Sequence, residues 1–198
     1  IEPLFNALAR SARRGSIQPI VARHEAGAAF MADGYTRESG KLGVCTATTG
    51  PGATNLLTGV ACAYQNEIPM LVITGQSALP SFGRAAFQES SCTGIDTVSM
   101  FKSCTNYSTL VSHPEQFEHK FVTAVMNAFC PRPGPAHLSV PLDVARAPWS
   151  AVRPKYDLND LLRRPSSVDT VAIDRLEREL SVARRPVLLI GGGCGEAI

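Results

Sequence analysis

The sequence is poor in charge, in aromatic side chains and in long apolar runs. Charged residues make up 18% of the 198 positions and the formal net charge is +2, so nothing points to nucleic acid or an anionic membrane as a partner. No apolar run approaches the roughly 18 residues of a membrane span, and no signal-peptide pattern is present. The hydrophobic content of 44% still suffices for a packed core, so we expect a soluble globular protein.

Closely spaced cysteine pairs are also missing. None of the six cysteines belongs to a Cys-x-x-Cys pair, and several lie in apolar runs. We therefore predict free thiols in a reducing compartment, the cytoplasm, rather than disulfides or zinc ligands. His24 and His113 lack the spacing of metal ligands, so no metal site is expected. The cysteines are Cys45, Cys62, Cys92, Cys104, Cys130 and Cys194.

Two phosphate-binding signatures are incomplete. No Gly-Lys-Ser/Thr follows the glycine turn at Thr49–Gly52, which excludes a P-loop. The run Gly191-Gly192-Gly193 does not complete a GxGxxG fingerprint, because Glu196 stands where the third glycine is required. Taken alone, this run is interpreted as a simple turn at the end of a strand.

Short apolar runs alternate with amphipathic stretches along the chain. This pattern is typical of a doubly wound α/β domain with a mostly parallel sheet and flanking helices. Helices are expected over residues 1–13, 24–39, 51–65 and 114–129, with a short helix within 94–102. Strands are expected over residues 18–22, 42–47, 70–74, 107–111 and 136–140, and a long loop over 76–93.

The composition changes after residue 147, where prolines and polar residues become frequent. We therefore predict a first domain over residues 1–147, a linker over 148–167, and the beginning of a second α/β domain over 168–198. This second part should contain a helix over 168–183 and a strand over 186–190. Asp143, at the end of the last strand of the first domain, is expected to cap the turn into the linker.

Glu25 follows the first predicted strand and lies in the first turn of the next helix. It could simply complement the helix dipole, which is worth about 0.3–1 kcal/mol. A catalytic role would instead require an apolar pocket that raises the pKa of the carboxyl group. The neighbours Ala26, Ala28, Ala29 and Phe30 are compatible with such a pocket.

The turn Thr49-Gly50-Pro51-Gly52 follows the second predicted strand. It could be only a tight turn, or it could let the backbone approach a flat ligand without obstruction by a Cβ atom. Strand-to-helix turns of this kind are where open α/β sheets bind their ligands.

Four stretches, in this order, resemble motifs of thiamine diphosphate enzymes. They are RHEAGAAFMADGY (Arg23–Tyr35), TGPGATN (Thr49–Asn55), IPMLVITGQ (Ile68–Gln76) and AFQE (Ala86–Glu89). The resemblance is to the N-terminal pyrimidine-binding domain of the acetolactate synthase (acetohydroxyacid synthase) large subunit. It covers roughly residues 4–145 and then 186–193. The resemblance therefore implies the thiamine diphosphate-binding fold.

The resemblance also assigns roles to individual residues. It implies that Glu25 hydrogen-bonds the aminopyrimidine ring of thiamine diphosphate and helps to form the reactive ylide. It implies further cofactor contacts from Thr49, Gly50, Pro51, Gly52 and Asn55. By the same resemblance, Phe87, Gln88 and Lys102 lie on the substrate side, although each alone would be taken for a surface or packing residue.

The family holds the diphosphate through Mg²⁺ in another domain that carries a Gly-Asp-Gly motif. This sequence has no Gly-Asp-Gly, since its Asp33-Gly34 lies within the predicted Glu25 helix. Because this motif is absent, we expect the chain to be inactive alone. The family also has a strand before the first helix, so we expect the chain to be trimmed at its N-terminus. The resemblance implies a homodimer or homotetramer, and FAD in the parent protein near Gly191–Gly193.

The implied reaction of the parent is that of a transferase/lyase in branched-chain amino acid biosynthesis. It would decarboxylate a 2-keto acid such as pyruvate and join the product to a second carbonyl compound, giving acetolactate. Two alternatives stay open. One is another thiamine diphosphate enzyme on this scaffold, such as an oxalyl-CoA decarboxylase, a sulfoacetaldehyde acetyltransferase or an aldehyde lyase. The other is a truncated binding protein without catalysis.

Overall fold

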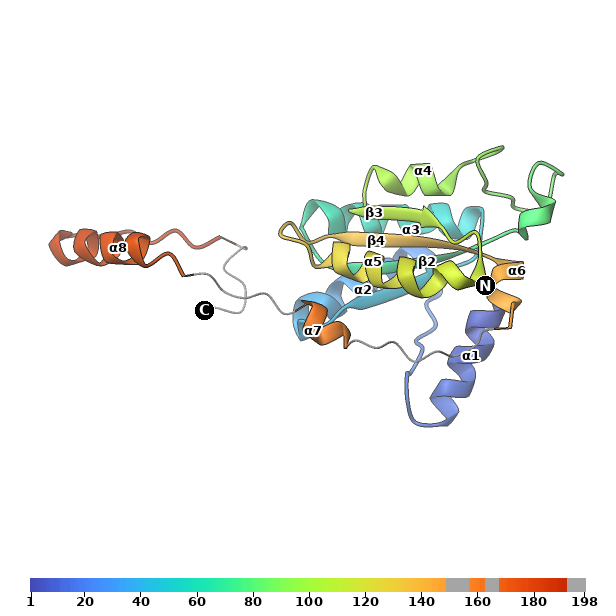
Figure 1. The fold of residues 1–198 in the computed structure, drawn as a ribbon, viewed down its shortest axis with the longest axis horizontal. Coiled ribbons are helices and arrows are strands. Elements are labelled where there is room, and N and C mark those ends of the chain that lie inside the picture. Colours follow the sequence, from blue (N-terminus) through green and yellow to red (C-terminus); the bar gives the residue numbers. More distant parts are fainter. Residues whose placement is uncertain (149–156, 163–167, 192–198) are drawn as a thin grey trace. The chain divides into compact units, whose positions relative to one another are not determined.

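The computed structural model describes residues 1–148, 157–162 and 168–191. It divides into two compact units, Ile1–Leu162 and Arg163–Ile198. The first unit contains a four-stranded, all-parallel sheet in the order β1-β2-β4-β3 (Figure 1). Its strands are β1 (Gly43–Ala47), β2 (Met70–Gln76), β3 (Tyr107–Leu110) and β4 (Pro135–Pro141). The predicted α/β class with a mostly parallel sheet is thus confirmed.

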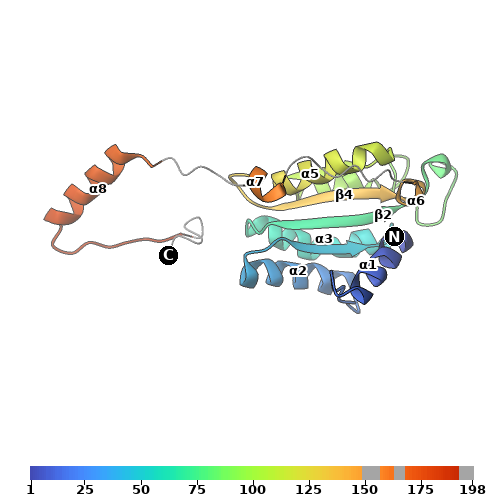
Figure 2. The same cartoon turned by 60° about the horizontal axis from the view of Figure 1, so that its bottom comes forward.

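Helices cover both faces of this sheet, with α2 and α3 on one face and α5 on the other (Figure 2). The helices of the first unit are α1 (Glu2–Arg13), α2 (Glu25–Ser39), α3 (Pro51–Gln65), α4 (Thr97–Lys102), α5 (Phe117–Ala128), α6 (Leu142–Arg146) and α7 (Leu158–Leu162). The first unit also contains two short 3₁₀ helices, η1 (Leu79–Ser81) and η2 (Pro114–Gln116). The second unit contains α8 (Thr170–Val182).

Side chains of β2 alternate between two hydrophobic clusters. Met70 and Val72 pack with α2, α3 and Phe101 of α4, whereas Leu71 packs on the opposite face with Leu138 and α5. Because a parallel sheet is covered on both faces, its strands are apolar throughout rather than in alternation. This explains why the run from Met70 onward was recognisable as a central strand.

Helices α2 and α3 begin and end at residues with clear sequence signals. His24 caps α2, since its Nδ1 accepts a hydrogen bond from the Ala26 N–H over 3.1 Å. Gly40 ends the same helix in the left-handed conformation, with a φ of 66°. Gly50 and Pro51 open α3, because proline fits the first helical position.

Two predicted strands are wrong. Residues 18–22 form no strand, and Ile20 and Val21 are 76% and 92% exposed. Residues 186–190 form none either, and Leu189 is 93% exposed. An apolar run becomes a strand only where a neighbouring strand accepts and donates its hydrogen bonds. Among the described residues, neither segment has such a neighbour, and β1 pairs with β2 alone.

The region after β4 also differs in detail from the expectation. Asp143 lies in the first turn of α6, and its Oδ1 accepts a hydrogen bond from the Leu79 N–H over 3.1 Å, so it fixes η1 rather than a linker turn. Within the predicted linker, 157–162 contains the unexpected helix α7. Residues 149–156, 163–167 and 192–198 lie outside the described residues, and with them Gly192, Gly193 and most of the linker. The proposed domain boundaries stay a prediction.

The cysteines of the described residues are free thiols, as predicted: Cys45, Cys62, Cys92, Cys104 and Cys130. Burial raises the pKa of the Cys45 thiol to about 12, so this cysteine is an inert packing residue rather than a nucleophile. Within the described part of the chain, no helix has both the length and the apolar character needed to cross a membrane.

Candidate functional site

Glu25 and Asn55 bring the N-terminal ends of α2 and α3 together. Oε2 of Glu25 accepts a hydrogen bond from Nδ2 of Asn55 over 3.1 Å. Glu25 is in the first turn of α2 and Asn55 in the second turn of α3. The two predicted strand-to-helix turns are therefore parts of one site, although the first lacks its predicted strand.

The second carboxylate oxygen of Glu25 lies beside the glycine turn. A Cβ atom added to Gly52 would stand 3.6 Å from Oε1 of Glu25 and only 2.8 Å from Cγ2 of Thr48. Gly50 has a φ of 63°, a conformation that side chains disfavour. The absence of two Cβ atoms thus leaves bare backbone next to a single carboxylate.

The electrostatic environment of Glu25 differs from the expected apolar pocket. Its pKa is lowered, first by a hydrogen bond from its own backbone N–H, then by the bond from Asn55. Ala29 is buried against α3, but Phe30 is 44% exposed, since adjacent helix positions point about 100° apart. Within this chain the carboxyl group is therefore ionised at neutral pH, and the Glu25 residue is only partly buried.

A second group of contacts ties the glycine turn to the loop after β2. Oγ1 of Thr49 lies 2.9 Å from the carbonyl oxygen of Gln88 and 3.2 Å from Oγ of Ser90. The Gly50 N–H donates to Oγ of Ser90 over 2.9 Å. Gln76, at the end of β2, accepts from the Ser90 N–H over 3.1 Å. Sequence reasoning assigned no role to Gln76 or Ser90, although Gln76 is the last residue of the IPMLVITGQ motif.

The predicted substrate-side residues are only partly brought together. Gln88 stands over the glycine turn, because a Cβ on Gly50 would meet Cβ of Gln88 at 2.9 Å. Phe87 is 87% exposed beside it. Lys102 is the exposed last residue of α4, and no hydrogen bond or ion pair among the described residues joins it to the other predicted site residues. Gln88 and Phe87 therefore adjoin the site, and Lys102 stays a prediction.

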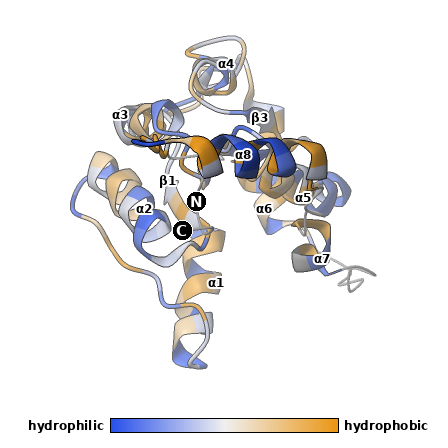
Figure 3. Ribbon diagram, turned by 90° about the vertical axis from the view of Figure 1, so that its left-hand side faces the viewer, coloured by the Kyte–Doolittle hydropathy of each residue, from blue (hydrophilic) through white to orange (hydrophobic). Residues whose placement is uncertain are grey.

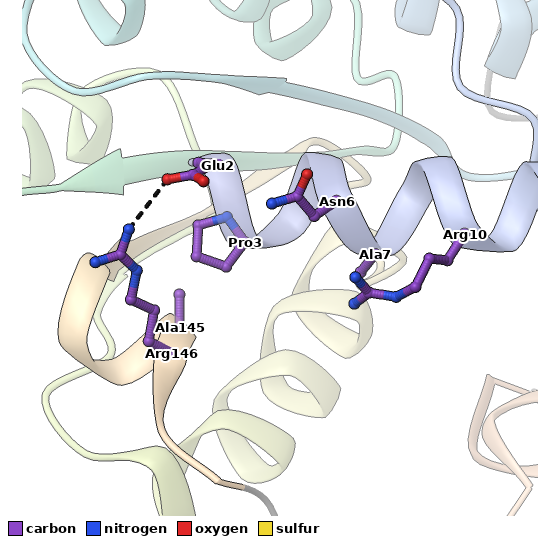
Figure 4. Close-up of a pocket in the computed structure, with 7 residues that line it drawn as sticks. All are labelled: Glu2, Pro3, Asn6, Ala7, Arg10, Ala145 and Arg146. Carbon is purple, nitrogen blue, oxygen red and sulfur yellow. Dashed lines mark hydrogen bonds and ion pairs between the residues drawn. The ribbon is translucent and has the colours of Figure 1, made fainter.

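A separate cavity lies between α1 and α6 (Figure 4). It has a volume of about 410 Å³ and is lined by Glu2, Pro3, Asn6, Ala7, Arg10, Ala145 and Arg146. An ion pair between Glu2 and Arg146, 3.0 Å long, crosses one side of it. None of the predicted site residues lines it. The described residues hold no group of three His, Cys, Asp or Glu side chains suited to a metal ion.

Comparison with known proteins identifies the family. Residues 1–100 match the family described as thiamine pyrophosphate enzyme, N-terminal TPP binding domain. The chain belongs to this family. The matched region contains Glu25, the glycine turn, Asn55 and the Gln88 loop, so the predicted resemblance is confirmed for the part of the chain that carries the site.

Three similar proteins extend the comparison beyond the TPP-binding domain. An acetolactate synthase of Arthrospira platensis is 39% identical over 193 residues, which are 96% of this chain and 32% of that protein. The acetolactate synthase isozyme 2 large subunit of Escherichia coli is 36% identical, over 100% of this chain and 34% of its own length. A probable 2-ketoarginine decarboxylase of Pseudomonas aeruginosa is 38% identical over a region that covers 92% of this chain and 32% of that protein. The chain thus spans about a third of each.

Proposed function

We propose that this domain binds the aminopyrimidine ring of thiamine pyrophosphate between Glu25 and the Thr49–Gly52 turn. The observation that carries the proposal is the position of Oε1 of Glu25 beside Gly52, where a side chain would fill the space. A flat heterocycle needs close backbone approach on its face and a hydrogen-bonding group at its edge. The glycine turn offers the first and the carboxyl group the second.

Each residue of the site has a role in this arrangement. Glu25 would exchange a proton with a ring nitrogen through Oε1, while Asn55 holds Oε2 and so fixes the rotation of the carboxyl group. Burial of the carboxyl group under the ring would raise its pKa from the low value of the open site, which favours holding a proton. The bound cofactor supplies the nucleophilic carbon that attacks the substrate carbonyl, and the protein supplies orientation and electrostatics.

For the full-length parent we propose a decarboxylase/carboligase that acts on a 2-keto acid such as pyruvate and forms acetolactate, within branched-chain amino acid biosynthesis. The names of the two acetolactate synthases support this choice. The 2-ketoarginine decarboxylase supports simple decarboxylation of another 2-keto acid as the second candidate, since its identity of 38% is equally high. In either case a further domain would hold the diphosphate through Mg²⁺; a FAD site would belong to the parent as well.

We also propose that the domain assembles as a homodimer or larger homo-oligomer in the cytoplasm. Its support is the outer face of α2, which carries Phe30, Met31 and Tyr35 at 44%, 46% and 51% exposure. Figure 3 colours α2 with both hydrophobic and hydrophilic segments. Sedimentation at increasing concentration tests this, and a strictly monomeric profile of the parent protein would contradict it.

The substitution Glu25→Gln in the full-length parent tests the proposed role of the site. The amide has the same shape but cannot hold the required proton, so turnover should fall by about 10²–10⁴-fold. Stability should change by about 1 kcal/mol or less, because mainly the interaction with the helix dipole is lost. Turnover at saturating thiamine pyrophosphate and Mg²⁺, together with thermal unfolding, measures both quantities.

The matched control is Glu38→Gln, which changes an exposed carboxylate at the other end of α2. It should leave turnover unchanged. If Glu25→Gln retained turnover within about threefold of the unmodified enzyme, far short of the acid–base scale, the proposed role would be wrong.

The isolated chain is expected to form no acetolactate from pyruvate, which a direct assay checks.

A further inference from the structure

The loop between β2 and α4 is joined to the glycine turn by buried hydroxyl and amide groups. Ser90 is 1% exposed and Gln76 is 4% exposed. The sequence separation of the bonded groups is large, at 40 residues between Gly50 and Ser90 and 39 between Thr49 and Gln88. These hydrogen bonds connect two segments that are far apart in the sequence.

The hydrogen-bond directions make Ser90 the central residue of this group. Its Oγ accepts from the Gly50 N–H over 2.9 Å and donates to the Gln88 carbonyl oxygen over 3.2 Å. Its own N–H donates to Oε1 of Gln76, and its carbonyl oxygen accepts from Thr97 at the start of α4. One small residue thus contacts the glycine turn, the Gln88 segment, β2 and α4.

The backbone of the Gln88 segment is in a conformation that needs external support. Gln88 has a φ of 56° and Ala85 a φ of 55°, values that cost non-glycine residues energy. The carbonyl oxygen of Gln88 accepts from both Thr49 and Ser90. The two hydroxyl groups therefore stabilise the conformation that places Phe87 and Gln88 beside the glycine turn.

We propose that Ser90 is a positioning residue that joins the cofactor side of the site to its substrate side. Through Ser90 and Gln76, the Thr49–Gly52 turn and the segment that carries Phe87 and Gln88 move as one hydrogen-bonded unit. The assignment of the two sides rests on the proposed function, whereas the joining itself depends only on the contacts given above. A substitution in one segment should consequently alter the amide exchange of the other segment.

The joining is tested in this 198-residue chain by amide hydrogen exchange of Ser90→Ala. The Gly50 N–H loses its acceptor, so its exchange should accelerate by roughly fivefold to tenfold, and the Glu89 N–H should accelerate with it. The matched control is Ser91→Ala, which removes a buried hydroxyl that bonds Glu89 and Thr93 instead of the turn. It should leave Gly50 unchanged. Unchanged exchange of Gly50 in Ser90→Ala would overturn the proposal.

A second variant changes the glycine turn instead of the loop, so this test does not require that Ser90→Ala folds well. Thr49→Val removes the hydroxyl that bonds the Gln88 carbonyl oxygen, so exchange within the Gln88 segment should accelerate although the substitution lies in the glycine turn. If only amides of the turn responded, the two segments would be independent and the proposal wrong.

The functional consequence is measured in the full-length parent protein. Ser90→Ala and Thr49→Val should each raise the KM for pyruvate by roughly tenfold or more, since misplaced binding groups weaken catalysis strongly, with a smaller change in kcat. Ser91→Ala should keep the original KM. Equal KM values in all variants, in an active enzyme, would refute the positioning role. A parent without turnover on pyruvate would contradict the proposed function instead. The exchange data alone would then show whether the glycine turn and the Gln88 segment form one hydrogen-bonded unit.

Discussion

Nδ2 of Asn55 donates a hydrogen bond to Oε2 of Glu25 over 3.1 Å, which links the N-terminal ends of α2 and α3 through two residues that are 30 positions apart in sequence. An amide N–H₂ group stabilises the ionised carboxylate more than the neutral acid. Asn55 therefore both orients Glu25 and lowers its pKa, after the larger effect of the Glu25 backbone N–H.

The first prediction concerns this pair. Asn55→Ala should raise the pKa of Glu25, because the ionised form loses a donor. Asn55→Asp should raise it further, because a like charge is added. Titration of the Glu25 carboxyl carbon by NMR measures both variants. Asn66→Ala, which removes an amide at the other end of α3 that bonds Cys62, is the control and should leave the titration of Glu25 unchanged. An unchanged Glu25 titration in Asn55→Asp would contradict the electrostatic role.

A second prediction concerns the contact between α2 and α3. A Cβ added to Gly59 would stand 2.5 Å from Cβ of Ala29 and 3.2 Å from the backbone nitrogen of Phe30. Gly59→Ala should therefore destabilise the fold by about 1–3 kcal/mol, the usual cost of overpacking. Gly34→Ala is the control, because a Cβ at Gly34 would meet nothing within 4 Å. It should stabilise α2 by up to about 1 kcal/mol in urea unfolding. Equal effects of the two variants would count against the close packing.

Local signals explain which parts of the fold could be predicted. Gly40 beyond α2, Pro51 at the start of α3 and the continuous apolar run of β2 are each determined by nearby residues. The error at residues 18–22 arose because a strand depends on a partner elsewhere in the chain, which composition does not report. The same limit applies to 186–190.

The candidate site shows the same division between local and long-range information. Glu25 and the glycine turn stood at strand-to-helix turns with recognisable motifs. Ser90 lies in no motif, and Gln76 was only the last residue of one; their importance comes from hydrogen bonds between residues that are distant in sequence. The partial exposure of Glu25 was also not predictable, because the burial of a helix residue depends on which elements pack against it.

A third prediction concerns Thr36, which joins α2 to the start of the sheet. Its buried Oγ1 accepts from the Gly43 N–H over 2.8 Å and lies 3.0 Å from the Pro69 carbonyl oxygen. Thr36→Val keeps the shape but leaves these buried backbone groups without their partner. It should cost about 1–3 kcal/mol in urea unfolding. Thr36→Ser retains the hydroxyl group and should lower the free energy of unfolding clearly less. If Thr36→Val were no more destabilising than Thr36→Ser, the hydrogen bonds of the hydroxyl group would not be the larger contribution to stability.

The last prediction concerns His137, which is buried in the sheet. Its Nε2 lies 2.8 Å from Oγ1 of Thr74, its Nδ1 lies 2.9 Å from Oγ of Ser108, and its ring stacks on Phe101 with centroids 4.1 Å apart. Because the Ser108 hydroxyl donates to the Val98 carbonyl oxygen, it accepts from Nδ1–H of the imidazole. Nε2 then accepts from Thr74, so the neutral ring is fully satisfied.

Burial lowers the pKa of His137 to about 3. The unfolded chain therefore binds a proton near the ordinary histidine value of about 6.5, well before the folded chain does. The stability that the neutral ring contributes is fully present above about pH 6.5 and is lost progressively as the pH falls towards 3. Between pH 7 and 5.5 this histidine alone should lower the free energy of unfolding by about 1.3 kcal/mol.

Urea unfolding at several pH values in this range measures the loss, above the range in which most carboxylates titrate. His137→Gln should remove this part of the pH dependence whatever its stability at pH 7, because glutamine binds no proton. His119→Gln, on the exposed side of α5, is the matched control and should keep the dependence. If the His137→Gln protein lost stability between pH 7 and 5.5 as steeply as the unmodified chain, another group would be the source, and the buried neutral imidazole would not limit stability in acid.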